Sequence, residues 1–174
     1  VKKDLTKIIE KYKKEFDIEY TDNLEISDLK TKVSNLEKGN SAILFVLLFK
    51  DTTGKYFTYK QSFEEVRKVS KVPIYGLWDF YLNSGMVGGL LTSAVAQGQT
   101  VSKMAIEVLN GKDIKDIPVV EESPNIYIFN YNELKRFNID IPKYIENPII
   151  INEPRSIYKE HKNFFIITII IILL

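Results

Sequence analysis

A continuous apolar run, Ser41–Phe49 (SAILFVLLF), constrains the fold more than any other stretch of this sequence. Gly39 and Asn40 precede it and the polar segment Lys50–Lys55 (KDTTGK) follows it, so turn-forming residues bound the run on both sides. A membrane-spanning helix needs roughly 20 consecutive apolar residues, which is more than this run provides. We therefore expect a strand that is buried on both faces, as in a parallel sheet with a layer of helices on each side.

Helical and strand-like patterns alternate around this run. Amphipathic spacing predicts the helices, and short apolar or alternating stretches predict the strands. In chain order the predicted elements are helix Asp4–Glu15, strand Phe16–Tyr20, helix Asp28–Leu36, strand Ser41–Phe49, helix Gln61–Ser70, strand Val72–Tyr75 and a helical stretch that ends at Leu109. Gly98 interrupts that last stretch, which is therefore either two helices or one bent helix. The alternation predicts an α/β fold with a doubly wound, mainly parallel sheet, and it places the loops after Tyr20, Phe49 and Tyr75 at one edge.

The pattern changes after Gly111. Ile117–Val120 and Ile126–Phe129 are predicted as short strands, and Tyr131–Phe137 as a helical turn. Prolines then interrupt the chain at positions 142, 148 and 154. We predict three segments. Residues 1–122 form an α/β lobe that is incomplete at its N-terminus, residues 123–158 form a hinge-crossing connector, and residues 159–174 form a membrane-proximal segment.

The end of the chain is its most apolar part. Phe164–Leu174 (FFIITIIIILL) carries no charge and shows no alternation, and the polar stretch Lys159–Asn163 precedes it as an interfacial flank would. We predict that this run is the start of a transmembrane helix, because a complete span is longer; a buried terminal strand is the alternative. His161, the single histidine, then belongs to a solvated flank and is not a catalytic base.

Composition excludes several classes of site. With 174 residues, 45% of them apolar, the chain can bury a core of its own. The formal net charge of +1 gives no electrostatic reason to expect nucleic acid as a partner. There is no cysteine, so disulfides, thiolate catalysis and zinc–thiolate sites are excluded, and one histidine cannot build a histidine-rich metal site. We predict no metal, no cofactor and no catalytic residue in this segment.

The strongest local signal of a site lies in Val72–Gly89 (VPIYGLWDFYLNSGMVGG). It contains the only tryptophan, Trp78, next to Asp79 and shortly after a predicted strand. Ligands of open α/β sheets bind in loops at the carboxyl ends of strands, and binding pockets combine aromatic walls with a few polar groups. We therefore predict that a small organic solute contacts this loop; the alternative is that Trp78 is a core residue at a strand end.

Two glycine-containing motifs do not match nucleotide-binding fingerprints. Gly85, Gly88 and Gly89 lack the spacing of the dinucleotide-binding motif, so we interpret them as positions where a helix start packs closely on the sheet. Asp51–Lys55 (DTTGK) is not a phosphate-binding loop of the Walker type and is interpreted as a turn near a cleft. A Rossmann-like nucleotide-dependent enzyme is therefore kept only as an alternative.

Three stretches carry a resemblance to a known family, namely VPIYGLWDFYLNSGMVGG, QGQTVSKMAIEVLNGKDIKDIPVVEESPN and NIYIFNYNELKRFNIDIP. Over about Asp4 to Pro154, and most specifically over Val72–Pro142, the sequence resembles the carboxy-terminal half of the ABC-transporter substrate-binding-protein-like family. The resemblance implies a type I periplasmic-binding-protein fold with two α/β lobes and a hinge, of which this chain is most of the second lobe. It also implies that the first lobe and the first strand of the second lobe precede Val1.

The same resemblance implies a set of ligand-binding residues. The cleft loops of the family fall on Thr21-Asp22, on Lys50-Asp51 and on Trp78-Asp79, and a further polar residue falls near the hinge crossing. The candidate ligand-binding residues are Asp22, Asp51, Trp78, Asp79 and Asn130. In this interpretation the indole of Trp78 stacks on the ligand, while the carboxylates of Asp51 and Asp79 accept hydrogen bonds from an ammonium or hydroxyl group.

These expectations combine into a function. We expect an extracytoplasmic domain at the cell membrane that binds a small solute for a signalling protein, such as a sensor histidine kinase or a cyclic-di-GMP enzyme. The expected partners are a small-molecule ligand, with an amino-acid-like solute as one candidate, the missing first lobe, and the membrane through the C-terminal helix. The substrate-binding component of an ABC transporter is the main alternative, and a gene fragment without function is a further one.

Overall fold

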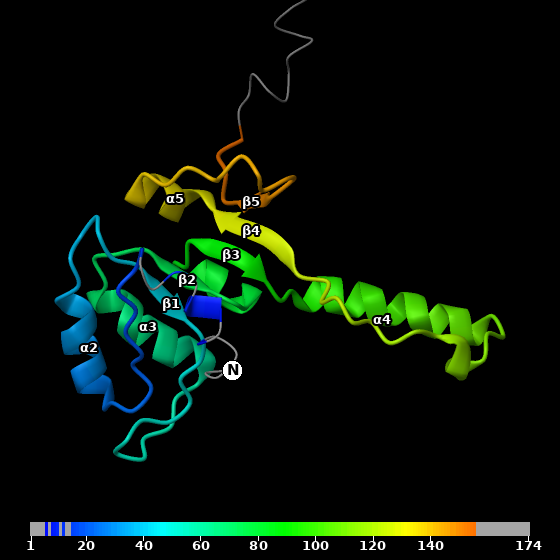
Figure 1. Ribbon diagram of the computed structural model, residues 1–174, viewed down its shortest axis with the longest axis horizontal. Coiled ribbons are helices and arrows are strands. Elements are labelled where there is room, and N and C mark those ends of the chain that lie inside the picture. The colour runs from blue at the N-terminus through cyan, green and yellow to red at the C-terminus, as the bar shows by residue number, and fades with distance from the viewer. Residues whose placement is uncertain (1–5, 7, 11, 13–14, 156–174) are drawn as a thin grey trace, which may run out of the picture.

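The computed structural model describes residues 6, 8–10, 12 and 15–155, which form a five-stranded sheet with helices on its faces (Figure 1). The strands, which lie side by side in the order of the sequence, are β1 (Ile43–Phe45), β2 (Ile74–Gly76), β3 (Gly88–Leu91), β4 (Ile126–Asn130) and β5 (Ile149–Ile151). Strand β1 is parallel to β2, β2 to β3, and β4 to β5, whereas β3 and β4 are antiparallel. The predicted α/β class with a mainly parallel sheet is confirmed.

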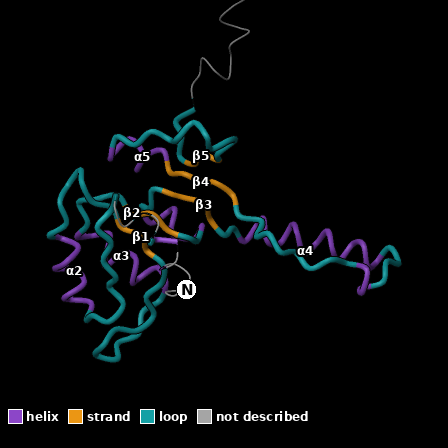
Figure 2. The backbone as a smooth tube through the Cα atoms, in the orientation of Figure 1, coloured by secondary structure: helices purple, strands orange, loops and turns teal. Residues whose placement is uncertain are grey.

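The helices are distributed unevenly around this sheet (Figure 2). They are α2 (Ile26–Ser34), α3 (Tyr59–Val69), α4 (Ala94–Leu109) and α5 (Tyr131–Phe137), together with the 3₁₀ turns η1 (Asp79–Ser84) and η2 (Ile114–Asp116). Helices α2 and α3 pack against each other beside β1 and β2, and α5 packs on β4. Helix α4 instead extends away from the sheet (Figure 1).

The main core lies between the sheet and the α2–α3 layer. At its centre three rings meet: Phe45 of β1, Phe63 of α3 and Tyr81 of η1. The ring of Phe45 meets each of the other two edge-on at 5.3 Å between centroids, and Phe63 and Tyr81 stack at 4.8 Å. Aromatic pairs in these geometries contribute about 0.5–1.5 kcal/mol each beyond their burial. The three rings therefore fix a strand, a helix and the turn after β2 relative to one another.

A second, smaller core covers the opposite face of the sheet. Val87, Phe129 and Leu134 are buried there. The partly buried side chains around them are Tyr75, Tyr127, Phe137, Ile139, Ile141 and Ile145. Strands β4 and β5 lie within the predicted connector, residues 123–158, yet they belong to the same sheet as β1–β3. The segment boundaries at residues 122 and 158 remain predictions.

Local capping signals explain the elements that the sequence predicted well. Helix α3 begins with a capping box: the Gln61 amide donates to Thr58 Oγ1 (3.2 Å), and the Thr58 amide donates to Gln61 Oε1 (3.0 Å). The N-cap of α5 is Asn130, whose side chain accepts from the Asn132 amide (3.1 Å). The predicted helix Gln61–Ser70 and the predicted turn Tyr131–Phe137 are accordingly present, and α3 begins two residues before the predicted start and ends one residue before the predicted end.

Three predicted strands are wrong in position or extent. Residues 16–20 and residues 117–120 form no strand. Of the apolar run, Ile43–Phe45 alone is strand, and β1 is an edge of the sheet that the structure describes. Its central residue, Leu44, is 51% exposed, because no described layer covers that side of β1. The expectation of a strand buried on both faces is therefore wrong for the described part of the chain.

Two of the glycines that the sequence analysis placed at a helix start lie in a strand, and the third, Gly85, is the C-cap of η1. Gly88 and Gly89 lie in β3, and the helix begins only at Ala94. Gly88 has φ = +136°, and a Cβ at that position would overlap the carbonyl oxygen of Ile128 on β4. The close approach of β4 thus explains this glycine. Gly98 does not interrupt α4, which is one continuous helix, and β5 was not predicted.

Two terminal predictions fall wholly or partly outside the described residues. Within the predicted helix Asp4–Glu15, the described residues Thr6, Ile8 and Ile9 are helical. The apolar run Phe164–Leu174 and its flank with His161 are not described. In the part of the chain that is described, no helix is long and apolar enough to cross a membrane.

Candidate functional site

Exposed aromatic side chains gather beyond the carboxyl ends of β1 and β2. Phe49 contacts Tyr59 at 4.8 Å between ring centroids, Tyr59 contacts Phe80 at 5.1 Å, and Phe80 stacks on Trp78 at 5.9 Å. Three of these residues are nearly half exposed, namely Phe49 (46%), Tyr59 (45%) and Phe80 (48%). We call these four residues the aromatic surface. A row of rings open to solvent at this edge of an α/β sheet is the arrangement expected of a ligand-binding wall.

The residues of the aromatic surface lie on separate elements of the backbone. The Phe57 amide donates to the Phe49 carbonyl (2.8 Å) and closes the hairpin after β1. Tyr59 is the first residue of α3 and follows the capping residue Thr58. Trp78 pairs with Thr92 in an isolated parallel bridge beyond β2 and β3. The surface thus combines a hairpin, a helix start and a strand extension, so its rings converge from three elements.

The aromatic surface rests on the main core. Phe80 contacts Tyr81 at 4.5 Å between centroids, and Tyr81 is fully buried against Phe45 and Phe63. Burial, together with the nearby Tyr59, raises the pKa of the Tyr81 hydroxyl to about 12, so this group is neutral throughout the physiological range. Its hydroxyl has no hydrogen-bond partner among the described residues. The wall is therefore seated on a buried ring of the main core.

Asp51, a predicted ligand contact, is buried and already bonded within the protein. Its carboxylate accepts from the Thr53 hydroxyl (2.6 Å), from the amides of Thr53 and Lys55 (each 3.0 Å) and from the Ile26 amide (3.4 Å). The hydrogen bond from the Thr53 hydroxyl is the largest of the effects that hold the pKa of this carboxyl below its ordinary value. The geometry places Asp51 as the organiser of its own turn and of the start of α2.

Asp79 lies at the edge of the aromatic surface. Its amide donates to the Thr92 carbonyl (3.2 Å), and its carboxylate accepts from the Ala94 amide (3.2 Å) at the first residue of α4. The N-cap residue Ser93 makes no side-chain capping bond, so Asp79 supplies the cap from a distance in sequence. The Ala94 amide is the one donor to the Asp79 carboxylate among the described residues, so most of the acceptor capacity of the carboxylate is unused.

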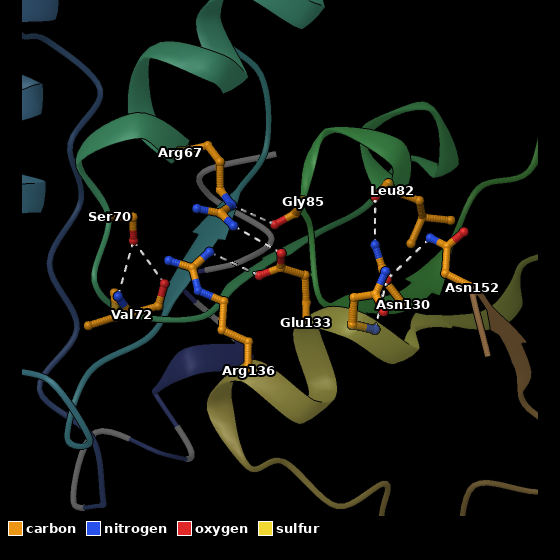
Figure 3. A network of polar contacts seen from close by, with 10 residues as sticks. Arg67, Ser70, Val72, Leu82, Gly85, Asn130, Glu133, Arg136 and Asn152 are labelled. Carbon is orange, nitrogen blue, oxygen red and sulfur yellow. Dashed lines mark hydrogen bonds and ion pairs between the residues drawn. The ribbon is translucent and has the colours of Figure 1, made fainter. Parts of the chain in front are cut away.

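Asn130 and Asp22 have different surroundings. Asn130 is buried: its side-chain amide donates to the Leu82 carbonyl (3.1 Å), and its oxygen accepts from the amide of Asn132 and the side chain of Asn152 (3.3 Å), as Figure 3 shows. It joins η1, α5 and the residue after β5. Asp22 is exposed and follows residues 16–20, which form no strand, so the predicted strand end does not position it.

Sequence reasoning missed an ionic cluster around the buried carboxylate of Glu133 (Figure 3). Arg67 of α3 donates from Nε to the Gly85 carbonyl (3.1 Å) and from Nη2 to Glu133 Oε1 (2.9 Å). Arg136 donates to the other oxygen of Glu133 (3.4 Å). Burial raises the pKa of the Glu133 carboxyl, against the opposing effect of Arg67. The spacing of Glu133 and Arg136 is a local signal, but Arg67 lies 66 residues away from Glu133, which no local pattern reveals.

The comparison with family models decides the family. Residues 2–148 match the model described as ABC transporter substrate binding protein. The chain belongs to this family. The resemblance predicted from the sequence is confirmed. The family is one of substrate-binding proteins, and one of the two solved structures described below is also a substrate-binding protein.

Two solved structures show the same fold. The ligand-free, open structure of a substrate-binding protein with adhesive properties from Clostridium difficile has a TM-score of 0.60 at 18% identity; the match covers 88% of this chain and 50% of that one. A conserved domain protein from Vibrio cholerae O1 biovar eltor has a TM-score of 0.51 at 16% identity, with 84% and 48% covered. No curated protein matches the sequence. The chain thus spans about half the length of its solved neighbours.

Proposed function

We propose that this chain is a ligand-binding lobe and that its aromatic surface forms one wall of the ligand site. The observation that carries the proposal is the continuous contact of Phe49, Tyr59, Phe80 and Trp78, exposed at the carboxyl edge of the sheet and seated on the buried ring of Tyr81. Family membership supports a binding role over the Rossmann-like enzyme alternative. The rings favour a small solute with a flat, apolar portion, because such a group can stack on them.

In this proposal Asp79 makes most of the polar contacts with the ligand. Within the described part of the chain, four donors bond to the carboxylate of Asp51, whereas that of Asp79 accepts from one, the Ala94 amide. Asp79 also adjoins Trp78 in sequence, so a solute that stacks on the indole can direct an ammonium or hydroxyl donor to the free lone pairs of Asp79. In this proposal Asp51 and Asn130 support the site from within, and Asp22 remains an untested contact.

Ligand binding would act by closure of two lobes. The solved neighbours are about twice as long as this chain, so a second lobe can supply the other wall. The hinge would lie where the chain leaves β3 and returns to β4, since Leu91 pairs with Ile126 there. A ligand shifts such an open–closed equilibrium only by its differential affinity for the two states. Stacking between two walls, as opposed to one, provides that difference.

Two cellular roles fit this site, and we propose that the domain is extracytoplasmic in both. Delivery of a solute to an ABC permease is supported by the family description. Sensing for a membrane-bound signalling protein, the role expected from the sequence, is supported by the uncharged run Phe164–Leu174. Sequencing the gene on both sides of this segment separates them: a completed span followed by a kinase or cyclase domain establishes the sensor, and a permease gene alongside establishes transport.

The ligand site is tested with the gene-encoded protein, using Trp78 as an intrinsic probe because it is the only tryptophan in this chain. We would screen aromatic amino acids, nucleobases, aliphatic amino acids and sugars by tryptophan emission and confirm hits by calorimetry. Planar solutes should bind, and Tyr59→Ala or Phe80→Ala should weaken binding about tenfold, equivalent to ~1.4 kcal/mol.

The control for these variants is Tyr56→Ala. Tyr56 is an exposed tyrosine (74%) on the hairpin that follows Phe49, where Lys50 lies over its ring, and it is outside the aromatic surface. Its removal should leave affinity unchanged. Equal affinities for the Tyr59, Phe80 and Tyr56 variants would remove the aromatic surface from the ligand site.

A further inference from the structure

The turn η1 carries two residues of the proposed ligand site, but its own hydrogen bonds do not fix its shape. Asp79 and Phe80 are its first two residues. It is a 3₁₀ helix of six residues, and runs beyond three or four are uncommon because the hydrogen bonds of a 3₁₀ helix are poorly aligned. The bond that closes it, from the Gly85 amide to the Leu82 carbonyl, is long at 3.3 Å. Contacts from other elements are therefore needed to hold η1 in place.

Other elements hold η1 at both of its ends. At the start, the first amide of η1 donates to the Thr92 carbonyl, beyond β3 (3.2 Å). At the end, the Asn130 side chain donates to the Leu82 carbonyl (3.1 Å). Arg67 Nε donates to the carbonyl of the next residue outside the turn, Gly85 (3.1 Å). The end of η1 is thus attached through side chains of β4 and α3, whereas its start is attached through the backbone.

The guanidinium group of Arg67 is oriented by a second bond. Its Nη2 donates to Glu133 Oε1 of α5 (2.9 Å), and the Glu133 residue is 8% exposed. Figure 3 shows Arg67 between the Gly85 carbonyl and the Glu133 carboxylate. A guanidinium group is a rigid, planar fork, so the bond to Glu133 fixes the direction in which Nε points. The side chain of Arg67 therefore connects α5 to the end of η1.

Gly85 is a second, independent indication that this contact matters. Gly85 has φ = +94°, in the left-handed region that favours glycine. A Cβ at this position would also lie 2.6 Å from Arg67 Nε, so any larger residue would displace the guanidinium group. An ion pair between Arg67 and Glu133 alone does not require this close approach. The glycine and the arginine therefore fit each other at the end of η1.

We propose that Arg67 is a positioning residue of the ligand site, which holds the end of η1 and thereby orients Asp79 and Phe80 at its start. Arg67 acts through the Gly85 carbonyl and not through contact with the ligand. A solute that stacks on Phe80 and bonds to Asp79 needs both side chains in place at once. Without the Gly85 contact, η1 can shift relative to Trp78, which is paired separately with a residue beyond β3. The inference rests on the proposed function, because it assigns η1 to the ligand site.

Two substitutions of Arg67 separate its two bonds. Arg67→Lys retains a positive charge for Glu133 but has a methylene group in place of Nε, so it loses the bond to the Gly85 carbonyl. Arg67→Gln has its amide nitrogen at the position of Nε and can donate to Gly85, but it lacks the charge. We expect Arg67→Lys to bind a planar solute about tenfold more weakly than the wild type, the loss of one ordinary hydrogen bond. Arg67→Gln should bind more tightly than Arg67→Lys, although urea unfolding should show that it is the less stable of the two.

The experiment measures affinity by calorimetry on the gene-encoded protein, with phenylalanine and adenine as planar probes. Arg136→Lys is the matched control, because Arg136 donates to the other oxygen of Glu133 (3.4 Å) and comes from α5. It should bind the probes as the wild type does. Without ligand, near-ultraviolet circular dichroism reports on the stacking of Phe80 on Trp78. This spectrum should change in Arg67→Lys and should stay unchanged in Arg136→Lys.

Equal affinities and equal spectra for Arg67→Lys and Arg136→Lys would overturn the proposal. An affinity that follows stability, weaker in Arg67→Gln than in Arg67→Lys, would also overturn it, because Arg67 would then act only by holding the fold together. If the wild type bound no solute of the screen, the proposed function would fail. The ligand-free spectra would still decide, in that case, whether Arg67 orients η1.

Discussion

Helices α3 and α4 are both amphipathic, but α3 packs in the core of this structure and α4 does not. Helix α3 begins with the Thr58–Gln61 capping box and buries Phe63 and Val66. Helix α4 is longer and richer in apolar side chains, but it buries none of them. The difference is one of topology: α3 connects two neighbouring parallel strands and returns onto their sheet, whereas α4 leaves and re-enters at one antiparallel pair. The apolar pattern of a helix indicates that it packs against other apolar side chains. The connections of the helix to the sheet determine whether this lobe provides those side chains.

The largest expected effect separates the two helices by their contribution to stability. Phe63→Ala should lower the free energy of unfolding of the chain by about 3–5 kcal/mol, because it removes a fully buried ring that contacts Phe45 and Tyr81. Val101→Ala in α4 should change it by no more than ~0.5 kcal/mol. Urea unfolding measures both. A comparable loss for Val101→Ala would mean that α4 is packed in the isolated chain, and the contrast between the helices would disappear.

The ionic anchor of α3 gives the next largest effect. Arg67→Met should cost about 2–3 kcal/mol at pH 7, because it leaves the Glu133 carboxylate buried beside Arg136 alone. Lys68→Met is the control, since Lys68 bonds to Glu65 at the surface and should cost at most ~1 kcal/mol.

The pH dependence of that loss follows from the direction of the Glu133 pKa. Burial raises it and Arg67 opposes the rise, so removing Arg67 raises it further. A carboxyl with a raised pKa in the folded state destabilises the protein increasingly as pH rises through that pKa, and the penalty is absent once the group is protonated. The cost of Arg67→Met should therefore shrink as the pH is lowered from 7 toward 4 in urea titrations. A cost that is independent of pH would show that the lost contacts of Arg67, and not its charge, carry the effect.

A smaller effect tests the junction between the lobe and the segment after β4. Asn130→Ala should cost about 1–2 kcal/mol, because it removes the cap of α5 and leaves the Leu82 carbonyl without this donor. Asn132→Ala, at an exposed position two residues later, should be close to neutral. Equal effects of the two variants in urea unfolding would show that Asn130 does not hold η1 and α5 together, and would leave it available as a ligand contact.

The elements that sequence reasoning predicted share local causes. Thr58 with Gln61, and Asn130 with Asn132, specify where α3 and α5 begin within a few residues of chain. The strand β3 was missed because the reason for Gly88 is the carbonyl of Ile128, which lies on another strand. The unburied state of α4 was missed for a related reason, since spacing identifies an apolar face without naming what covers it.

The candidate site divides in the same way. The loops containing Trp78, Asp79 and Asp51 were predicted from their positions after strands, and the structure places Trp78 and Asp79 at the aromatic surface. Tyr59 and Phe80 were not predicted, although aromatic residues so close to both loops were a usable signal. The occupied state of the Asp51 carboxylate was not predictable, because one of its donors, the Ile26 amide, lies 25 residues earlier.

The smallest expected effect sharpens the comparison because its sign is opposite to that of the others. In the 174-residue chain, Gly98→Ala should slow the hydrogen exchange of α4 amides about fourfold, since alanine is favoured over glycine by ~0.8 kcal/mol in a helix and the new Cβ meets no atom within 4 Å. Ala96→Gly on the same helix should speed the exchange by a similar factor. If neither substitution changed the exchange of α4 amides, helix propensity would not determine the stability of α4, and its contrast with α3, which is stabilised by the packing of Phe63 and Val66, would need another cause.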